Sequence, residues 1–349
     1  MFFASDNWAG AHPAIAARLS GAAGGFSTAY GDGDLDRAVY EKFSEIFERE
    51  VAVFFVATGT AANSLSLALY GKAGGISFCH REAHIVEDEC GAVEYFSGGG
   101  RLQGIDGNQG RIKPVALEQA LGHFFPESVH AGRPTTISIT QSTEIGTVYS
   151  LQDIEAISTI AGSRNLPLHM DGARFANALV SLETTAAEMT WKRGVDIVSF
   201  GGTKNGCWCA EAIVLFDLEL AREMAFLRKR AGQLFSKSRF VAAQFAAYFH
   251  DDLWLENARH SNSMATRLAG TIDAALKARL AWQPQANEVF AIVGNEVAAR
   301  LQAAGATFHH WPAPAGFAGD LGEDEKIYRF VTSFATKEED IDRLADLIR

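Results

Sequence analysis

The chain has 349 residues, of which 48% are hydrophobic and 21% charged, and its formal net charge is −11. This length predicts about two domains and enough apolar surface for a large core. The acidic balance argues against a nucleic-acid partner, since backbone binding needs a basic face. The longest apolar runs, such as residues 51–57, are far shorter than the roughly 20 residues of a membrane helix, so no membrane partner is expected.

The first ten residues, MFFASDNWAG, lack a basic segment followed by an apolar stretch, so no secretory signal is expected. The four cysteines are too few for a disulfide framework in a chain of this size. Together these features predict a protein of the reducing cytoplasm.

In chain order, the pattern first predicts an amphipathic helix over residues 36–50, with Phe43 and Phe47 on its apolar stripe. Short apolar or β-branched runs then alternate with helical segments such as residues 60–71 and 151–165. This alternation predicts an α/β fold with a mainly parallel, seven-stranded sheet covered by helices on both faces. The predicted strands are 51–56, 76–79, 101–105, 135–141, 166–170, 195–200 and 212–216.

The pattern changes after about residue 240, where a long helix-rich stretch begins. Short apolar runs follow it at residues 286–293, 306–312 and 327–334. We therefore expect two domains. Residues 1–240 would form the large α/β domain together with the N-terminal segment, and residues 241–349 a smaller α+β domain.

Several polar residues follow the predicted strands, at the sheet edge where ligands of open α/β folds bind. Gly59 and Thr60 end one strand and begin a helix whose free N–H groups can bind phosphate, with Thr60 as its cap. Asp171 ends a second strand, and Thr203 and Lys204 follow a third. A partly desolvated lysine is costly to bury without a role, and such amines form Schiff bases. This combination predicts a pyridoxal 5'-phosphate site, in which the carboxylate keeps the ring nitrogen protonated.

Two histidines, His80 and His84, lie four residues apart in FCHREAHIVEDE, residues 78–89. On one helix face this spacing suits a metal, but Arg81 stands where the zinc-peptidase pattern needs glutamate. Within a pyridoxal-phosphate site a planar imidazole can lie over the ring, and we assign this role to His84. A metal-dependent hydrolase built on the two histidines and residues 87–89 stays as an alternative.

Together these motifs resemble the low-specificity L-threonine aldolases, which are fold-type-I, aspartate-aminotransferase-like enzymes of the β-eliminating lyase group. The branch that contains phenylserine aldolase is especially similar. HMDGAR followed by TKNG is the most specific part of a resemblance that spans nearly the whole chain. The matching segments are SDN (5–7), YGDGDLD (30–36), ATGTAAN (57–63), REAHIVEDECGA (81–92), SITQSTEIGTVY (138–149), LHMDGARFANALV (168–180), VDIVSFGGTKNG (195–206), LRKRAGQLFSKSRF (227–240) and YRFVTSF (328–334).

The resemblance implies specific roles around the cofactor. Lys204 would carry it as a Schiff base, Asp171 would pair with the pyridine nitrogen, and His84 would stack on the ring and help with proton transfer. The residues that would hold the phosphate are Gly59, Thr60 and Thr203.

The resemblance also implies how the small amino-acid substrate binds. Arg174 would bind the cofactor's phenolic oxygen and the substrate carboxylate, with Ser5 and Arg329 completing the carboxylate clamp. Tyr30 would lie near the active site at a subunit interface, because enzymes of this fold form homodimers or homotetramers with shared sites.

The chain departs from the family pattern at two places. Where many threonine aldolases have a histidine in an E-N-T-H segment, residues 141–144 read QSTE, so either Glu144 or another residue would face the β-hydroxyl of the substrate. Ser236 stands where the family has a phosphate-contacting arginine from a neighbouring subunit, with Lys237 and Arg239 close by.

The resemblance implies retro-aldol cleavage of a β-hydroxy-α-amino acid, such as threonine, allo-threonine or phenylserine, to glycine and an aldehyde. One alternative keeps the cofactor but catalyses β-elimination or transamination. Others are the metal-dependent hydrolase using His80 and His84, and a non-catalytic protein that binds pyridoxal phosphate.

Overall fold

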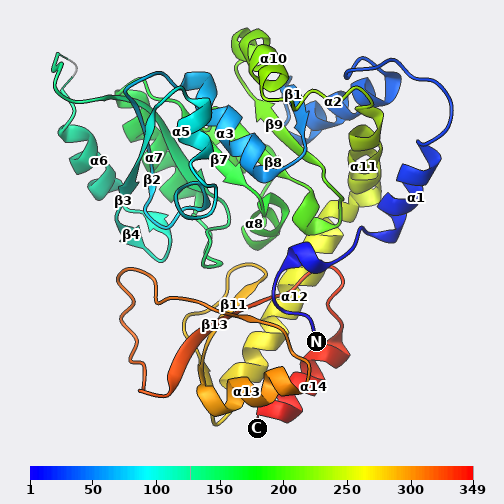
Figure 1. Cartoon of the computed structure of the whole chain (residues 1–349), viewed down its shortest axis with the longest axis vertical. Helices are drawn as coiled ribbons and strands as arrows, with labels where there is room; N and C mark the ends of the chain where they lie inside the picture. The colour runs from blue at the N-terminus through cyan, green and yellow to red at the C-terminus, as the bar shows by residue number, and fades with distance from the viewer. Residues whose placement is uncertain (126, 349) are drawn as a thin grey trace.

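A computed structural model describes residues 1–125 and 127–348 of the chain. In the larger part of the molecule, seven strands form one sheet (Figure 1). The strand order is β1-β9-β8-β7-β6-β2-β3, and only β9 runs antiparallel to its neighbours. The predicted mainly parallel, seven-stranded sheet is therefore confirmed. The strands are β1 (Ala52–Val56), β2 (Gly75–His80), β3 (Arg101–Ile105), β6 (Arg133–Thr140), β7 (Leu168–Gly172), β8 (Ile197–Gly201) and β9 (Glu211–Leu215).

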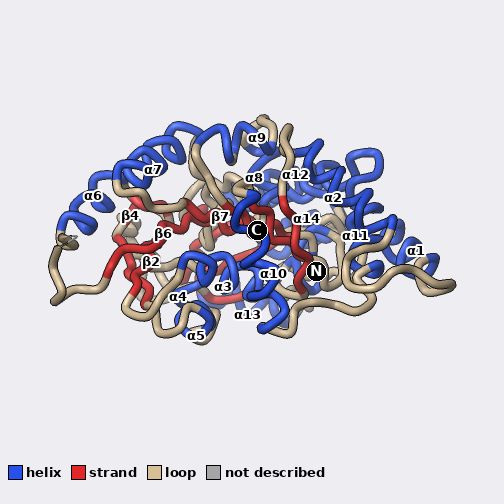
Figure 2. Tube along the Cα trace, turned by 90° about the horizontal axis from the view of Figure 1, so that it is seen from above, coloured by secondary structure: helices blue, strands red, loops and turns tan. Residues whose placement is uncertain are grey.

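Helices cover both faces of this sheet, which lies between two helical layers (Figure 2). Phe54 and Val56 of β1 pack toward one layer, whereas Val53 and Phe55 pack toward the other. Because both faces are buried, the strands are almost continuously apolar. One layer has α3 (Gly59–Tyr70), α4 (His84–Glu87), α5 (Ala92–Phe96) and α10 (Ala221–Arg230). The other layer has α2 (Asp34–Ile46), α6 (Pro114–Gly122), α7 (Leu151–Ser163), α8 (Phe175–Ser181), α9 (Ala186–Met189) and α11 (Arg239–Phe249). Helix α1 (Pro13–Gly21) packs on α11, and a short hairpin of β4 (Gly107–Asn108) and β5 (Arg111–Ile112) lies near the sheet.

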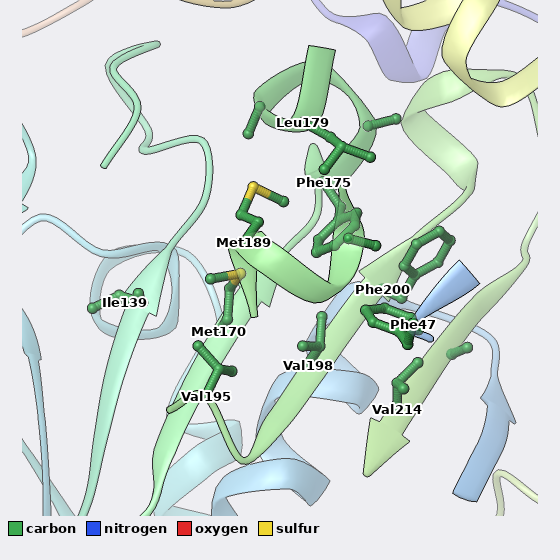
Figure 3. Packing of buried hydrophobic residues seen from close by; sticks show 14 of the residues in the cluster. Phe47, Ile139, Met170, Phe175, Leu179, Met189, Val195, Val198, Phe200 and Val214 are labelled. Carbon is green, nitrogen blue, oxygen red and sulfur yellow. The ribbon is translucent and has the colours of Figure 1, made fainter. Parts of the chain in front are cut away.

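An aromatic cluster holds α2 against the sheet. The Phe43 ring lies edge-on to Phe200 at 5.2 Å and to Phe249 at 5.0 Å between centroids. Phe47 extends the cluster toward Phe175 and β8 (Figure 3). Edge-to-face packing of buried rings adds to the free energy gained from burying their apolar area. The predicted apolar stripe of α2 is confirmed, although the helix ends at Ile46.

A second, antiparallel sheet forms the smaller part of the molecule. Its order is β10-β11-β13-β12, with β10 (Ala278–Leu280), β11 (Glu288–Gly294), β12 (His309–His310) and β13 (Glu325–Val331). One face packs on α12 (Leu253–Asp273), α13 (Asn295–Ala303) and α14 (Glu338–Ile348). The other face meets Ile145 of the large sheet's β6–α7 loop. Within the described residues no helix has both the length and the hydropathy to cross a membrane.

The packing connects the chain's two ends. Phe3 is fully buried in the core of the small sheet, where its ring lies 6.2 Å from that of Phe330. Helix α11 crosses the expected boundary at residue 240 and packs in the large core through Phe245. Helix α12 contributes Trp254 to the large core and Leu268 to the small one. We infer that the division between the two units lies within α12.

Candidate active site

The carboxyl ends of β1, β2, β7 and β8 border a cavity of about 440 Å³. This is the edge at which parallel α/β sheets bind ligands. Six of the predicted site residues line it: Gly59, Thr60, His84, Asp171, Thr203 and Lys204. Residues that we did not predict also line it: Asn7, Ala57, Thr58, Asn63, Glu89, Ala173, Trp208, Cys209 and Glu211.

Lys204 lies in a 3-10 turn, η3 (Thr203–Asn205), directly after β8. Asn205 holds the turn in place, because its side-chain amide donates to the Tyr248 hydroxyl at 2.7 Å. Gly206 closes the turn at φ +110°, a conformation that favours glycine. The half-buried Lys204 amine makes no hydrogen bond to any described residue. The fold therefore presents a free primary amine to the cavity.

A chain of hydrogen-bonded side chains connects His84 with Asp171. The His84 Nδ1 lies 2.8 Å from Glu89 Oε1, which also accepts from the Asn63 amide at 2.8 Å. The same Asn63 nitrogen donates to Asp171 Oδ2 at 2.9 Å, and Asp171 Oδ1 accepts from the Ala173 N–H at 3.0 Å. Glu89 therefore fixes the orientation of the imidazole, and Asn63 that of the carboxylate.

The charges of these hydrogen-bonded side chains favour a cation in the cavity. Asp171 is 2% exposed, and burial, with the charge of Glu89 beside it, raises the pKa of its carboxyl group. The hydrogen bond that His84 Nδ1 donates to the Glu89 carboxylate raises the pKa of His84, and the charge of Glu144 raises it further. A protonated ring nitrogen bound beside Asp171 would offset the cost of ionising this buried carboxylate.

The N-terminus of α3 borders another part of the same cavity. The capping residue is Thr58, whose hydroxyl accepts from the Ala61 N–H at 3.1 Å, so the expectation that Thr60 caps the helix is wrong. The N–H groups of Gly59 and Thr60 have no hydrogen-bond partner within the described part of the chain. A Cβ added at Gly59 would meet nothing within 4 Å, so it would point into open space. This terminus can hold an anion.

Glu211 is a buried carboxyl group beside that helix terminus. Its Oε1 accepts from the Thr203 N–H at 3.2 Å, and the side chain lines the cavity. Burial raises the pKa of Glu211 to about 7, although hydrogen bonds from Thr203 act in the opposite direction. Glu211 therefore takes up a proton more readily than an exposed glutamate, and its protonated form can donate to an anion bound there.

A second charged cluster contains Arg174 and Arg329, neither of which lines the cavity. Arg174 binds Asp6 through Nε at 2.8 Å and Nη2 at 3.2 Å, and its Nη1 lies 3.2 Å from Glu288. Arg329 Nη1 lies 3.6 Å from the other oxygen of Glu288, and its guanidinium stacks 4.4 Å from the Trp311 ring centroid. Both predicted clamp residues thus meet at one internal carboxylate.

The remaining predicted residues lie outside the cavity lining of this chain. Ser5 caps the 3-10 helix η1 (Asp6–Trp8) by accepting from the Asn7 N–H at 3.2 Å. Tyr30 is 51% exposed, and its N–H donates to the Ser236 carbonyl. Glu144 is half-buried in the loop after β6, close enough for its charge to act on His84.

The helix-face pair of histidines that the metal-dependent alternative requires is not formed. His80 ends β2 and His84 begins α4, so they do not share a helix. The His80 Nδ1 accepts from the Glu82 N–H at 3.2 Å, and burial lowers the pKa of His80 to about 4. Across residues 1–125 and 127–348, no three His, Cys, Asp or Glu side chains form a group suited to a metal ion.

The sequence contains signals for some of the site residues outside the predicted set. Asn63 stands four residues after Gly59, on the same helix face. Glu211 and Glu288 each occupy the first position of an otherwise apolar strand, where an isolated carboxylate is unusual. Glu89 belongs to an acidic run that, in the sequence alone, resembles a solvated loop.

Comparison with known proteins places this geometry in context. The model of the family described as "Beta-eliminating lyase" matches residues 3–296. A low-specificity L-threonine aldolase from Pseudomonas aeruginosa is 38% identical over 347 residues, covering 99% of this chain and 96% of the relative. The solved structure of a threonine aldolase from Leishmania major superimposes with a TM-score of 0.91 at 28% identity, covering 99% of this chain and 98% of that one. A structure from Listeria monocytogenes, described as a putative L-allo-threonine aldolase, has a TM-score of 0.73 at 16% identity over 97% of this chain and 94% of its own, which shows a shared fold.

Proposed function

We infer that this chain, which belongs to the beta-eliminating lyase family, is a pyridoxal-phosphate-dependent aldolase that cleaves β-hydroxy-α-amino acids to glycine and an aldehyde. One observation carries this proposal: a single cavity is bordered by the free amine of Lys204, the buried carboxylate of Asp171 and the unpaired N–H groups at the start of α3. The aldolase relatives support the substrate class.

The residues at the cavity fit pyridoxal phosphate. When bound, this cofactor supplies a protonated ring that withdraws electrons from the substrate's α-carbon. Lys204 would hold its aldehyde carbon and Asp171 its ring nitrogen, while the N–H groups of Gly59 and Thr60 would hold its phosphate. Thr203 would complete the phosphate site, with Glu211 beside it.

Two side chains are available to handle protons. Cleavage of the Cα–Cβ bond needs a group that accepts the proton of the β-hydroxyl. We assign this role to Glu144, whose half-buried carboxylate acts electrostatically on His84. His84, held at Nδ1 by Glu89, would cover the ring and help to move a proton.

We propose that Arg174 and Arg329 bind the substrate carboxylate, with Ser5 nearby. In support, both guanidinium groups already face one carboxylate, that of Glu288. A clamp of this kind fixes the α-carbon so that the bond to be broken is aligned with the electron-withdrawing ring.

Three finer statements are proposals from the family resemblance. The substrates would include phenylserine beside threonine and allo-threonine. The protein would act in the cytoplasm as a homodimer or homotetramer. A neighbouring subunit would cover Tyr30, whose side chain is about half exposed in the single chain.

The test is to incubate holoprotein with threonine, allo-threonine and phenylserine and to measure glycine and aldehyde. We expect Lys204→Ala to lose turnover and the visible absorbance of bound cofactor, while the exposed Lys326→Ala control keeps both. An unchanged visible spectrum in Lys204→Ala would contradict the proposal. Ammonia and pyruvate as products would instead indicate β-elimination, and cofactor colour without turnover would indicate a non-catalytic binder.

A further inference from the structure

Glu288, the first residue of β11, is a fully buried carboxylate without a hydrogen bond. Its exposure is 0%, and neither of its oxygens has a hydrogen-bond partner within the described chain. The Nε of Arg329 is likewise buried and unpartnered among those residues. Buried polar atoms are nearly always paired. The Glu288 oxygens are held only by ion pairs, to Arg174 at 3.2 Å and to Arg329 at 3.6 Å, neither of which has hydrogen-bond geometry. An anion that binds between the two arginines would therefore compete with Glu288 for them.

The charges around Glu288 leave little room for a further anion. Arg174 at the start of α8 and Arg329 on β13 face it, as do Asp6 of η1 and Glu144 of the β6–α7 loop. If all are ionised, three carboxylates face two guanidinium groups. The carboxylate of a substrate would add a fourth negative charge in a poorly solvated site, where like charges repel strongly.

We propose that Glu288 is a proton-linked positioning residue, which holds Arg174 and Arg329 together in the free protein and takes up a proton when a substrate carboxylate binds between them. The inference rests on the proposed function, because it takes these arginines as the carboxylate clamp. Protonation removes the competing negative charge, and the neutral carboxyl group can then donate to the bound carboxylate.

The ionisation of the neighbouring acids indicates which one takes the proton. Burial raises the pKa of Glu288 to about 7 in spite of Arg174 and Arg329, and Glu144 and Asp6 act in the same direction as burial. The pKa of Asp6 is instead lowered: burial opposes this, but Arg174 and Lys204 outweigh it. Near neutral pH, Glu288 therefore accepts a proton at small cost, whereas Asp6 stays ionised.

This linkage has a defined sign. Below about pH 7 Glu288 is already protonated in the free protein, so carboxylate affinity should not change with pH. Above that pH, binding must bring in a proton, and the affinity should fall by up to about tenfold per pH unit. Replacing Glu288 by glutamine should remove this dependence, because glutamine does not titrate.

The probe is propionate, a carboxylate without an amine, which binds without forming a Schiff base and without turnover. Saturating propionate is added to weakly buffered holoprotein at pH 8, and proton uptake is followed with a pH indicator dye. We expect uptake approaching one proton per site in the wild type, almost none in Glu288→Gln, and retained uptake in the matched variant Glu144→Gln. Propionate should bind Glu288→Gln about tenfold more tightly than the wild type at pH 8.

Equal uptake in the wild type and Glu288→Gln would overturn the inference, as would uptake that disappears only in Glu144→Gln, or wild-type protein that does not bind propionate. Should Glu288→Gln fail to fold, the wild type alone decides, because a propionate affinity that is flat from pH 6 to pH 9 refutes the linkage. Proton uptake without cleavage of any hydroxy amino acid would reject the proposed function alone. Normal cleavage without uptake would reject this inference alone.

Discussion

The buried carboxyl group of Glu211 makes the stability of the protein depend on pH in a predictable way. Burial raises its pKa from the ordinary 4.5 to about 7. At ~1.36 kcal/mol per pH unit, this displacement corresponds to about 3 kcal/mol. Because the folded pKa is the higher one, the carboxylate destabilises the fold progressively as pH rises from about 4.5 through about 7.

Glu211→Gln removes this titration and keeps an oxygen to accept from the Thr203 N–H. Its stability relative to the wild type should therefore increase by about 2 to 3 kcal/mol between pH 5 and pH 8. In a chain of this length that corresponds to about 3 °C in melting temperature.

The assay is thermal and urea unfolding of the cofactor-free protein at pH 5, 6, 7 and 8. The exposed Glu219→Gln serves as the matched control, and its difference from the wild type should stay near zero throughout. A constant offset between Glu211→Gln and the wild type at all four pH values would refute the reasoning, because it would mean that Glu211 has the same pKa in both states.

Other substitutions give further tests. Glu89→Gln should lower kcat/KM by roughly 10- to 100-fold and move the acid limb of its pH profile to lower pH, since Glu89 raises the pKa of His84; an unmoved limb would reject this pairing. Glu144→Gln should lower the cleavage rate roughly 100-fold or more but leave the affinity for the cofactor unchanged, as measured by absorbance titration; equal losses would indicate a structural role. Phe43→Ala should lower the free energy of unfolding by about 3–5 kcal/mol in urea titrations, and a loss below about 1 kcal/mol would show that the aromatic cluster repacks.

Much of the large sheet could be predicted from the sequence because its strands are buried on both faces. Each predicted strand overlaps an observed one, and residues 101–105 match β3 at both ends. Lys204 could be located for a related reason, since a lysine at the end of a buried strand is costly without a role, and Asp171 could be located because it ends a neighbouring strand of the same sheet. They were therefore identified from local pattern and side-chain chemistry together.

Other features depend on contacts that local pattern does not contain. The sequence has threonines on both sides of Gly59, and only the extended backbone of Thr58, at φ −141° and ψ 153°, makes it the cap. Glu89 meets Asn63 across 26 residues of chain, through packing of α3 beside the β2–α5 connection. Glu288 meets Arg174 because the small sheet docks against the loops of the large one.

The first six residues connect the small unit to the large one. Phe3 is buried in the core of the small unit, and Asp6, three residues later, accepts two hydrogen bonds from Arg174 of the large unit. So short a span has almost no slack. Any hinge motion that moved the small unit away would have to break the hydrogen bonds between Asp6 and Arg174 or withdraw Phe3 from the core of the small unit, so such a motion is coupled to the pairing of Arg174.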